Sequence, residues 1–109
     1  MTTKTEVRTI SKEELHQKML KGEPVQIVNV LDPEYYKLGI IKGSQRIPLD
    51  QLDRRLQELD KRREVVTYCA NTKCTASRMG AEKLAAAGFD VKAYEGGAQE
   101  WVQAGLPTE

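Results

Sequence analysis

Two cysteines, Cys69 and Cys74, are the residues of this sequence with the clearest chemical potential. They are its only cysteines, and both lie in one polar loop between an apolar stretch and an alanine-rich stretch. A cysteine placed where a strand ends and a helix begins faces backbone N–H groups and the positive end of the helix dipole. Both features stabilise a thiolate and an anionic adduct on it. Cys69 directly follows the apolar stretch, so we predict that it is the nucleophile.

The rest of the loop is polar and offers donors to an anion. We expect its backbone to form the substrate-binding cradle around the Cys69 sulfur, with the residues Ala70, Asn71, Thr72, Lys73, Cys74 and Thr75. Lys73 and Arg78 are the neighbouring cations, and Lys73 is placed to help bind an anionic substrate. Cys74 has two interpretations: a resolving thiol for a modified Cys69, or a small residue that packs at the helix start. The loop contains no His, Asp or Glu, which argues against a Cys–His protease arrangement. The alternative for Cys69 itself is an inert buried cysteine.

The elements that must position this loop alternate between strand and helix. A capping-box pattern at Ser11–Glu14 indicates a helix start, and Gly22 and Gly88 are typical helix ends. This order predicts a single α/β domain over residues 1–109, with a mostly parallel sheet, helices on both faces and a flexible segment 1–6. The site then lies at the carboxyl ends of the strands. The predicted strands are 7–10, 25–31, 45–47, 64–68 and 90–94, and the last two helices are 76–87 and 98–104.

Two further local patterns give specific expectations. Asp32 and Pro33 are typical of an N-cap and a first helical position, so a brief helix follows them. Tyr35 and Tyr36 in that helix either line a ligand pocket or pack with their hydroxyls at the surface. Leucines at 49, 52, 56 and 59 recur at helical spacing and predict one helix with a buried stripe.

The composition excludes several classes of partner. Hydrophobic residues make up 39% and charged residues 30% of the chain, and the formal net charge is +1, so neither nucleic acid nor a membrane is an expected partner. Two cysteines and a distant His16 do not supply the four ligands of a zinc site, and no metal or cofactor is expected. The N-terminus lacks the apolar core of a signal peptide, which predicts a cytoplasmic location for a full chain. Nothing in the sequence indicates an oligomeric state.

The sequence resembles the rhodanese-like domains, the sulfurtransferase homology family, over most of its length. The matching segments are 65–69, 81–89, 94–97 with Trp101, and 104–107, with weaker matches at 33–36, 39–44 and 47–49. The resemblance implies that Cys69 accepts a sulfane sulfur, becomes a persulfide and passes the sulfur to a thiol or another thiophilic acceptor. It also implies that the partners are a small-molecule or protein sulfur donor and a thiol acceptor, and that the segment 70–75 is the cradle.

The chain departs from the family pattern in three places. Residues 29–31 read Asn-Val-Leu where the family often has Asp-Val-Arg, and residues 39–41 read Gly-Ile-Ile where it often has Gly-His-Ile. The loop after Cys69 is about two residues longer than in the commonest single-domain members, and resembles in length the loop of the related cell-cycle dual-specificity phosphatases. Those phosphatases have an arginine where this chain has Thr75, and Arg78 is not its equivalent. Phosphatase and arsenate-reductase activities are therefore disfavoured.

Two alternatives to sulfur transfer stay open at this point. A thiol redox element would cycle Cys69 and Cys74 through a disulfide. A non-catalytic interaction module would use the same fold without the cysteine chemistry, because a fold does not fix a function.

Overall fold

A five-stranded parallel sheet forms the centre of the computed structural model, which describes residues 7–109. The strands lie in the order β1-β5-β4-β2-β3, and every neighbouring pair is parallel. The predicted α/β class and parallel sheet are thus confirmed, although the strands are shorter than expected. The expectation of a flexible segment 1–6 lies outside the described residues. The strands are β1 Arg8–Thr9, β2 Gln26–Asn29, β3 Gln45–Arg46, β4 Val65–Tyr68 and β5 Val91–Tyr94.

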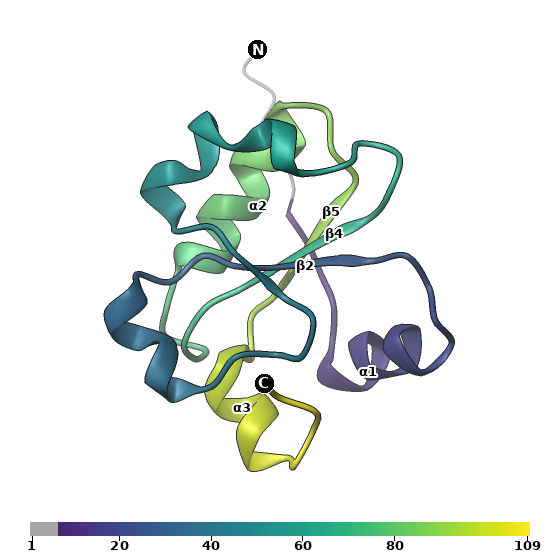
Figure 1. Ribbon diagram of the computed structural model, residues 1–109, viewed down its shortest axis with the longest axis vertical. Helices are drawn as coiled ribbons and strands as arrows, with labels where there is room; N and C mark the ends of the chain where they lie inside the picture. Colours follow the sequence, from purple (N-terminus) through teal and green to yellow (C-terminus); the bar gives the residue numbers. More distant parts are fainter. Residues whose placement is uncertain (1–6) are drawn as a thin grey trace.

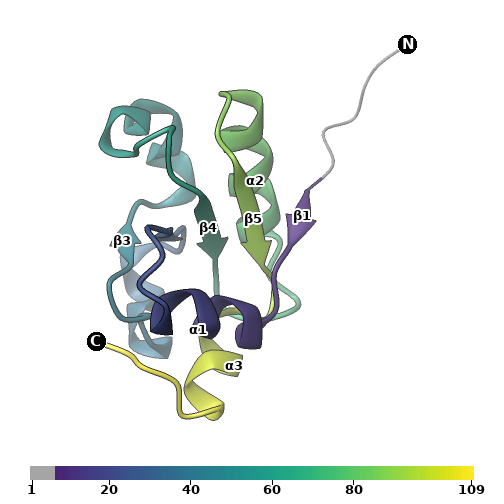
Figure 2. The ribbon, with the colours of Figure 1, turned by 90° about the vertical axis from the view of Figure 1, so that its right-hand side faces the viewer.

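Helices cover both faces of this sheet (Figures 1 and 2). In Figure 2, α1 lies in front of the sheet and α2 lies behind β5. The capping box at the start of α1 is confirmed, because the Ser11 hydroxyl accepts a hydrogen bond from the Glu14 N–H and the Glu14 carboxylate accepts one from the Ser11 N–H. The α-helices are α1 Lys12–Leu20, α2 Ala76–Ala86 and α3 Gly97–Gln103, and the 3-10 helices are η1 Pro33–Leu38, η2 Leu49–Arg54 and η3 Leu56–Glu58.

Strand β4 lies between the two halves of the core. Successive side chains of a strand point to opposite faces, and all four residues of β4 are buried. Val65 packs in a cluster with α2, η2 and η3, whereas Val66 and Tyr68 pack in a second cluster with α1 and α3. Cys69, one residue beyond the strand, continues the alternation and belongs to the α2 cluster. The fold therefore places the nucleophile predicted from the sequence on the α2 face of the sheet.

The predicted leucine helix is wrong in its details. The segment forms two 3-10 helices that are interrupted at Arg55, where the backbone φ is −119°. The Gln51 N–H bonds to the Pro48 carbonyl and the Arg55 N–H to the Leu52 carbonyl, so the hydrogen bonds run from i to i+3. Leu52 and Leu59 are nonetheless buried against α2. The leucine spacing correctly identified the buried side and not the helix type.

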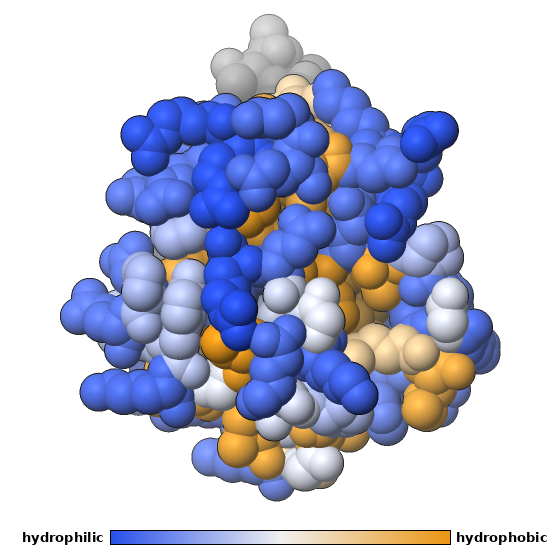
Figure 3. All heavy atoms as spheres, viewed as in Figure 1, coloured by the Kyte–Doolittle hydropathy of each residue, from blue (hydrophilic) through white to orange (hydrophobic). Residues whose placement is uncertain are grey.

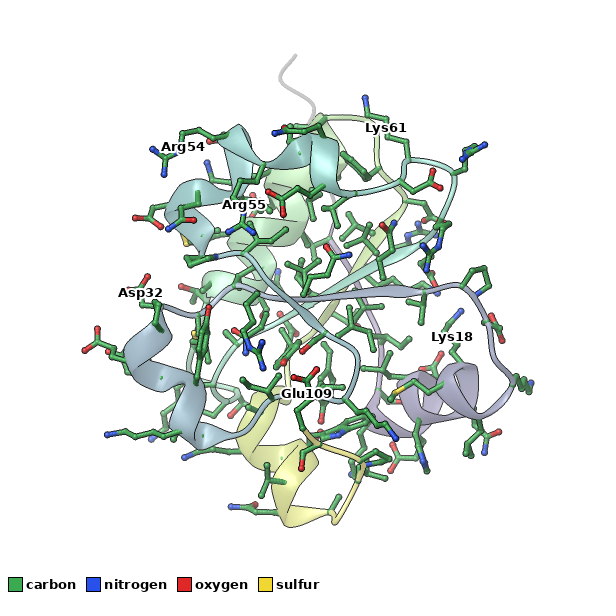
Figure 4. The ribbon with its side chains drawn as sticks, viewed as in Figure 1. Lys18, Asp32, Arg54, Arg55, Lys61 and Glu109 are labelled. Carbon is green, nitrogen blue, oxygen red and sulfur yellow. The ribbon has the colours of Figure 1, made fainter. Side chains whose placement is uncertain are left out.

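The expected N-cap at Asp32 is also not formed. The Asp32 side chain makes no capping hydrogen bond, and only its backbone carbonyl accepts a bond from the Tyr35 N–H, at 2.9 Å. A 3-10 helix rather than an α-helix begins at Pro33. The Asp32 carboxylate is therefore not occupied by capping, and Figure 4 shows it at the outer start of η1.

The surface is dominated by polar side chains. Figure 3 shows one face that is mostly hydrophilic, with smaller hydrophobic areas between the charged groups. Within the described part of the chain, no helix is both long and apolar enough to cross a membrane.

Candidate active site

Cys69 lies at the carboxyl end of the central strand, as predicted. It directly follows β4, its side chain is completely buried, and its carbonyl accepts a hydrogen bond of 2.8 Å from the Ala98 N–H at the start of α3. The strand pairing brings the ends of β2 and β5 to the same edge, because Tyr68 lies beside Asn29 on one side and Tyr94 on the other. Three strands thus bring their following loops to one place, which is the usual position of a site in a parallel sheet.

The backbone of the loop does not form the expected ring of N–H groups around the Cys69 sulfur. The Cys74 N–H bonds to the Asn71 carbonyl at 3.1 Å, and the Lys73 N–H bonds to the Asn71 side-chain oxygen at 3.0 Å. Asn71 therefore uses two of these donors inside the loop, in an Asx-type turn. The Cys69 thiol instead donates to the Cys74 carbonyl, with 3.4 Å between sulfur and oxygen. In this conformation Cys69 is a hydrogen-bond donor, and thus a protonated thiol.

The two thiols differ in acidity. The pKa of Cys69 is raised to about 11, chiefly by burial and next by its hydrogen bond with the Cys74 thiol, while the hydroxyl and N–H of Ser77 act to lower it. This differs from the lowered pKa that a helix start alone predicts, because burial away from water disfavours the thiolate. Burial also acts to raise the pKa of Cys74, but hydrogen bonds from the Cys69 thiol and from the N–H groups of Ala70 and Ala76 outweigh it and lower that pKa. Cys74 is thus the more acidic thiol.

Ser77 is a further polar residue beside Cys69. Its side chain is completely buried, and its hydroxyl oxygen has no hydrogen-bond partner of normal geometry within residues 7–109. The N–H and hydroxyl of Ser77 both act to lower the pKa of Cys69. The Ser77 carbonyl accepts a bond of 2.7 Å from the Thr67 hydroxyl, which ties the first turn of α2 to β4. A serine in the first turn of a predicted helix is the only sign of this role in the sequence.

A pocket of about 420 Å³ opens beside the loop. Cys74 forms part of its wall and is half-buried, whereas Cys69 does not reach the wall. Tyr35 also borders the pocket, so the pocket-lining interpretation holds for this tyrosine, while Tyr36 stacks under the Arg46 guanidinium. The lining residues are Val30, Leu31, Asp32, Tyr35 and Leu49 on one side and Ala70, Asn71, Lys73, Cys74 and Ala76 on the other.

The charges at the pocket are few. Lys73 and Asp32 are the charged residues of its wall. Arg78 instead forms an ion pair with Glu95, with 2.7 Å between nitrogen and oxygen, and no arginine among residues 7–109 borders the pocket. The Thr75 hydroxyl contacts the Met79 sulfur. The bidentate clamp that a phosphoryl group requires is therefore missing from the described site.

Gly97 is a positioning residue that appeared in the sequence only within the family-matching segment 94–97. Its φ is +77°, and a Cβ atom there would lie 2.6 Å from the carbonyl carbon of Ala70 and from the Asn71 nitrogen. The close approach lets the N–H groups of Ala98 and Gln99 bond to the carbonyls of Cys69 and Ala70. The beginning of α3 thereby holds the first part of the loop.

Comparison with known proteins identifies the family. The family model described as Rhodanese-like domain matches residues 11–104. This range includes both cysteines, the pocket wall and every strand of the sheet except β1. The chain therefore belongs to the rhodanese-like domain family, and the resemblance inferred from its motifs is confirmed.

Individual relatives differ in size and in their described roles. A sulfurtransferase of Allochromatium vinosum is 29% identical, and the match covers 93% of this chain and 94% of that protein. An HTH-type transcriptional regulator of Mycobacterium tuberculosis is 36% identical over 92% of this chain, but the match covers only 44% of the regulator. The structure of a rhodanese-like domain protein from Staphylococcus aureus has a TM-score of 0.79 and 33% identity, covering 87% of this chain and 91% of that one.

Proposed function

We propose that the chain is a sulfurtransferase that takes a sulfane sulfur onto Cys69 as a persulfide and passes it to a thiol or another thiophilic acceptor. The observation that carries the proposal is the place of Cys69 at the carboxyl end of β4, beside a second thiol and a pocket. Membership of the rhodanese-like family and the similarity to a protein described as a sulfurtransferase support it. Attack of the Cys69 thiolate on thiosulfate forms Cys69–S–S⁻ and releases sulfite. An acceptor thiol then takes the outer sulfur as its own persulfide and regenerates Cys69.

The pocket favours a donor with an anionic end and an apolar body. Lys73 supplies the positive charge at the wall, and Val30, Leu31 and Leu49 supply apolar surface. Asp32 on the same wall partly offsets the lysine, so the field at the pocket is weaker than that of a dedicated oxyanion site. A polysulfide or a protein persulfide fits this balance at least as well as thiosulfate. The donor, the acceptor and a cytoplasmic location remain predictions.

Intact mass and peptide mapping test the proposal. The protein is treated with thiosulfate or polysulfide, excess iodoacetamide caps thiols and persulfides, and trypsin then cuts after Arg63, Lys73 and Arg78. We expect a gain of one sulfur on peptide 64–73, which contains Cys69, and its loss when an acceptor thiol is added before capping. No gain with any of these donors, or sulfur found only on peptide 74–78, would contradict a persulfide on Cys69.

The nearness of the two cysteines favours one other function, a thiol redox element. The Cys69 thiol donates to the Cys74 carbonyl and interacts with the Cys74 thiol, so the two sulfurs are neighbours, as a disulfide requires. In that case an oxidant alone should remove two hydrogens rapidly and link peptides 64–73 and 74–78, and both cysteines should be required. Sulfur transfer instead predicts a sulfur adduct in the absence of oxidant.

A further inference from the structure

The two thiols lie at different depths from the pocket, with Cys74 nearer to it than Cys69. Cys74 is part of the pocket wall, whereas Cys69 is completely buried, is not part of that wall and contacts Cys74. The Cys69 thiol donates to the carbonyl of Cys74, and the two thiols contact one another. A donor molecule in the pocket therefore meets the Cys74 sulfur first, and the Cys69 sulfur is reached from the Cys74 sulfur.

The surroundings of each sulfur suit different steps. The N–H groups of Ala70 and Ala76 act to lower the pKa of the Cys74 thiol in the pocket wall, which is the environment expected for a thiolate that attacks a donor. The Cys69 sulfur lies beside the buried Ser77 hydroxyl, which has no other partner within the described residues. An unpaired buried hydroxyl is costly, and it can donate to a thiolate or a persulfide formed on Cys69. The inner position is thus equipped to hold a sulfur anion away from water.

We propose that Cys74 is the outer catalytic thiol, which accepts the sulfane sulfur from a donor in the pocket and hands it to Cys69. The proposal rests on the sulfurtransferase function proposed above and names the order of its steps. In the first step the Cys74 thiolate attacks the sulfane sulfur, the anionic persulfide Cys74–S–S⁻ forms, and the donor leaves with the electron pair of the broken bond. In the second step the Cys69 thiol passes its proton to this outer sulfur, and the resulting Cys69 thiolate attacks the same sulfur. The bond between the two sulfurs of the Cys74 persulfide breaks, and the products are Cys69–S–SH and the Cys74 thiolate.

The test uses the lysine between the two cysteines. Trypsin cuts after Lys73 and so separates Cys69, on peptide 64–73, from Cys74, on peptide 74–78. The full chain is exposed to polysulfide for a series of short times, capped with iodoacetamide and digested. We expect added sulfur on peptide 74–78 first and on peptide 64–73 later. Cys74→Ser should slow the loading of Cys69 by about tenfold or more, whereas Cys69→Ser should still take up sulfur on peptide 74–78.

Three results would overturn the proposal. The first is added sulfur that appears on peptide 64–73 before it appears on peptide 74–78. The second is a Cys74→Ser variant whose Cys69 takes up sulfur at the wild-type rate. The third is the formation of a disulfide between the two peptides without a persulfide on Cys69. Brief alkylation of the untreated wild type provides a second measurement that requires no variant and no sulfur. We expect it to label peptide 74–78 about tenfold faster than peptide 64–73.

The alkylation result also shows whether a negative outcome contradicts the proposed order, Cys74 before Cys69, or the proposed sulfurtransferase function itself. If the wild type takes no sulfur but Cys74 is alkylated first, the proposed function fails and the handover fails with it, while the outer position of Cys74 stands. If the wild type takes sulfur and Cys69 is alkylated first, the function stands and the order is wrong.

Discussion

The two faces of β4 differ in how completely their polar groups are paired. On the α1 and α3 face, the Tyr68 hydroxyl contacts the Asn29 amide, the Ile41 N–H and the Ser44 hydroxyl, and the Trp101 indole donates to the Pro107 carbonyl. On the α2 face, the Ser77 hydroxyl has no hydrogen-bond partner of normal geometry within residues 7–109, and Cys69 is a buried thiol. The first face thus supplies a scaffold whose buried tyrosine and tryptophan are hydrogen-bonded, and the other retains groups whose bonding is free to change during a reaction.

The largest predicted effect on the free energy of unfolding is at Gly97, where the start of α3 meets the loop after β4. Gly97 and Gly105 have nearly the same positive φ, +77° and +71°, but only Gly97 has backbone atoms within reach of an added Cβ. We expect Gly105→Ala to cost about 1 kcal/mol, since an L-residue is strained at this φ. Gly97→Ala should cost at least about 3 kcal/mol, because it also forces the loop away from α3. Urea unfolding of both variants measures the difference, and equal costs would show that α3 does not hold the loop.

The second largest effect on the free energy of unfolding is expected at Tyr68, on the α1 and α3 face of β4. Tyr68→Phe removes a buried hydroxyl with three hydrogen-bond contacts and leaves the Ile41 N–H without its partner, so we expect a loss of about 2 kcal/mol. Tyr35→Phe is the matched control, since Tyr35 is exposed, and it should change the stability by less than about 0.5 kcal/mol. If Tyr68→Phe were as mild as the control, the scaffold role of this face would be refuted.

The contrast between the faces also shows what the sequence can predict. The parallel sheet and the position of Cys69 follow from local patterns: apolar runs, caps, glycines and a cysteine directly after a strand. The family motifs confirmed the same arrangement. These features depend on residues close together in the chain, where one dominant pattern determines the outcome.

The interior of the site depends on contacts that no local pattern encodes. The Cys69 pKa is set by burial, which follows from the packing of α2 on β4 and not from the helix start that predicted a thiolate. The direction of the loop N–H groups is set by Asn71, whose side chain and carbonyl bind two of them. The close backbone contact between Gly97 and Ala70 involves residues 27 positions apart in the sequence. Only the tertiary structure brings these groups together.

The third prediction concerns the charge at the pocket on the reactive face. Lys73→Gln removes the positive side chain from the wall, and we expect capture of an anionic donor to slow by about fivefold, roughly 1 kcal/mol, because an exposed charge acts through screened attraction. Lys21→Gln, at the C-terminal end of α1, is the control and should leave the rate unchanged. The rates of persulfide formation are compared at low and high salt, and the difference between wild type and Lys73→Gln should shrink as the salt is raised. A difference that is independent of salt would mean that Lys73 acts through the loop conformation.

The smallest effect lies at the amino end of β4, opposite the cysteine. Glu64 is mostly buried between Lys18 and Lys92, with oxygen-to-nitrogen distances of 2.8 and 3.1 Å. Burial acts to raise the pKa of Glu64, but its hydrogen bonds to the two lysines outweigh burial and hold the pKa below its ordinary value of 4.5. A carboxyl whose pKa is lower in the folded state stabilises the fold above its unfolded-state pKa, and this contribution is lost as the pH falls through the folded-state pKa.

Glu64→Gln should therefore destabilise the protein by about 0.5–1 kcal/mol at pH 7. The difference from the wild type should shrink as the pH is lowered below 4.5, because both proteins then carry an uncharged group at position 64. Urea unfolding between neutral and acidic pH measures this trend. Glu82→Gln serves as the control, because Glu82 lies on α2 and forms no ion pair within residues 7–109. The thiol reactivities of Cys69 and Cys74 should be unchanged in Glu64→Gln, because Glu64 and Cys69 lie beyond opposite ends of β4. A change in their alkylation order would mean that the two ends of the strand are coupled, and that the reactive face is less independent of its scaffold than the hydrogen bonding indicates.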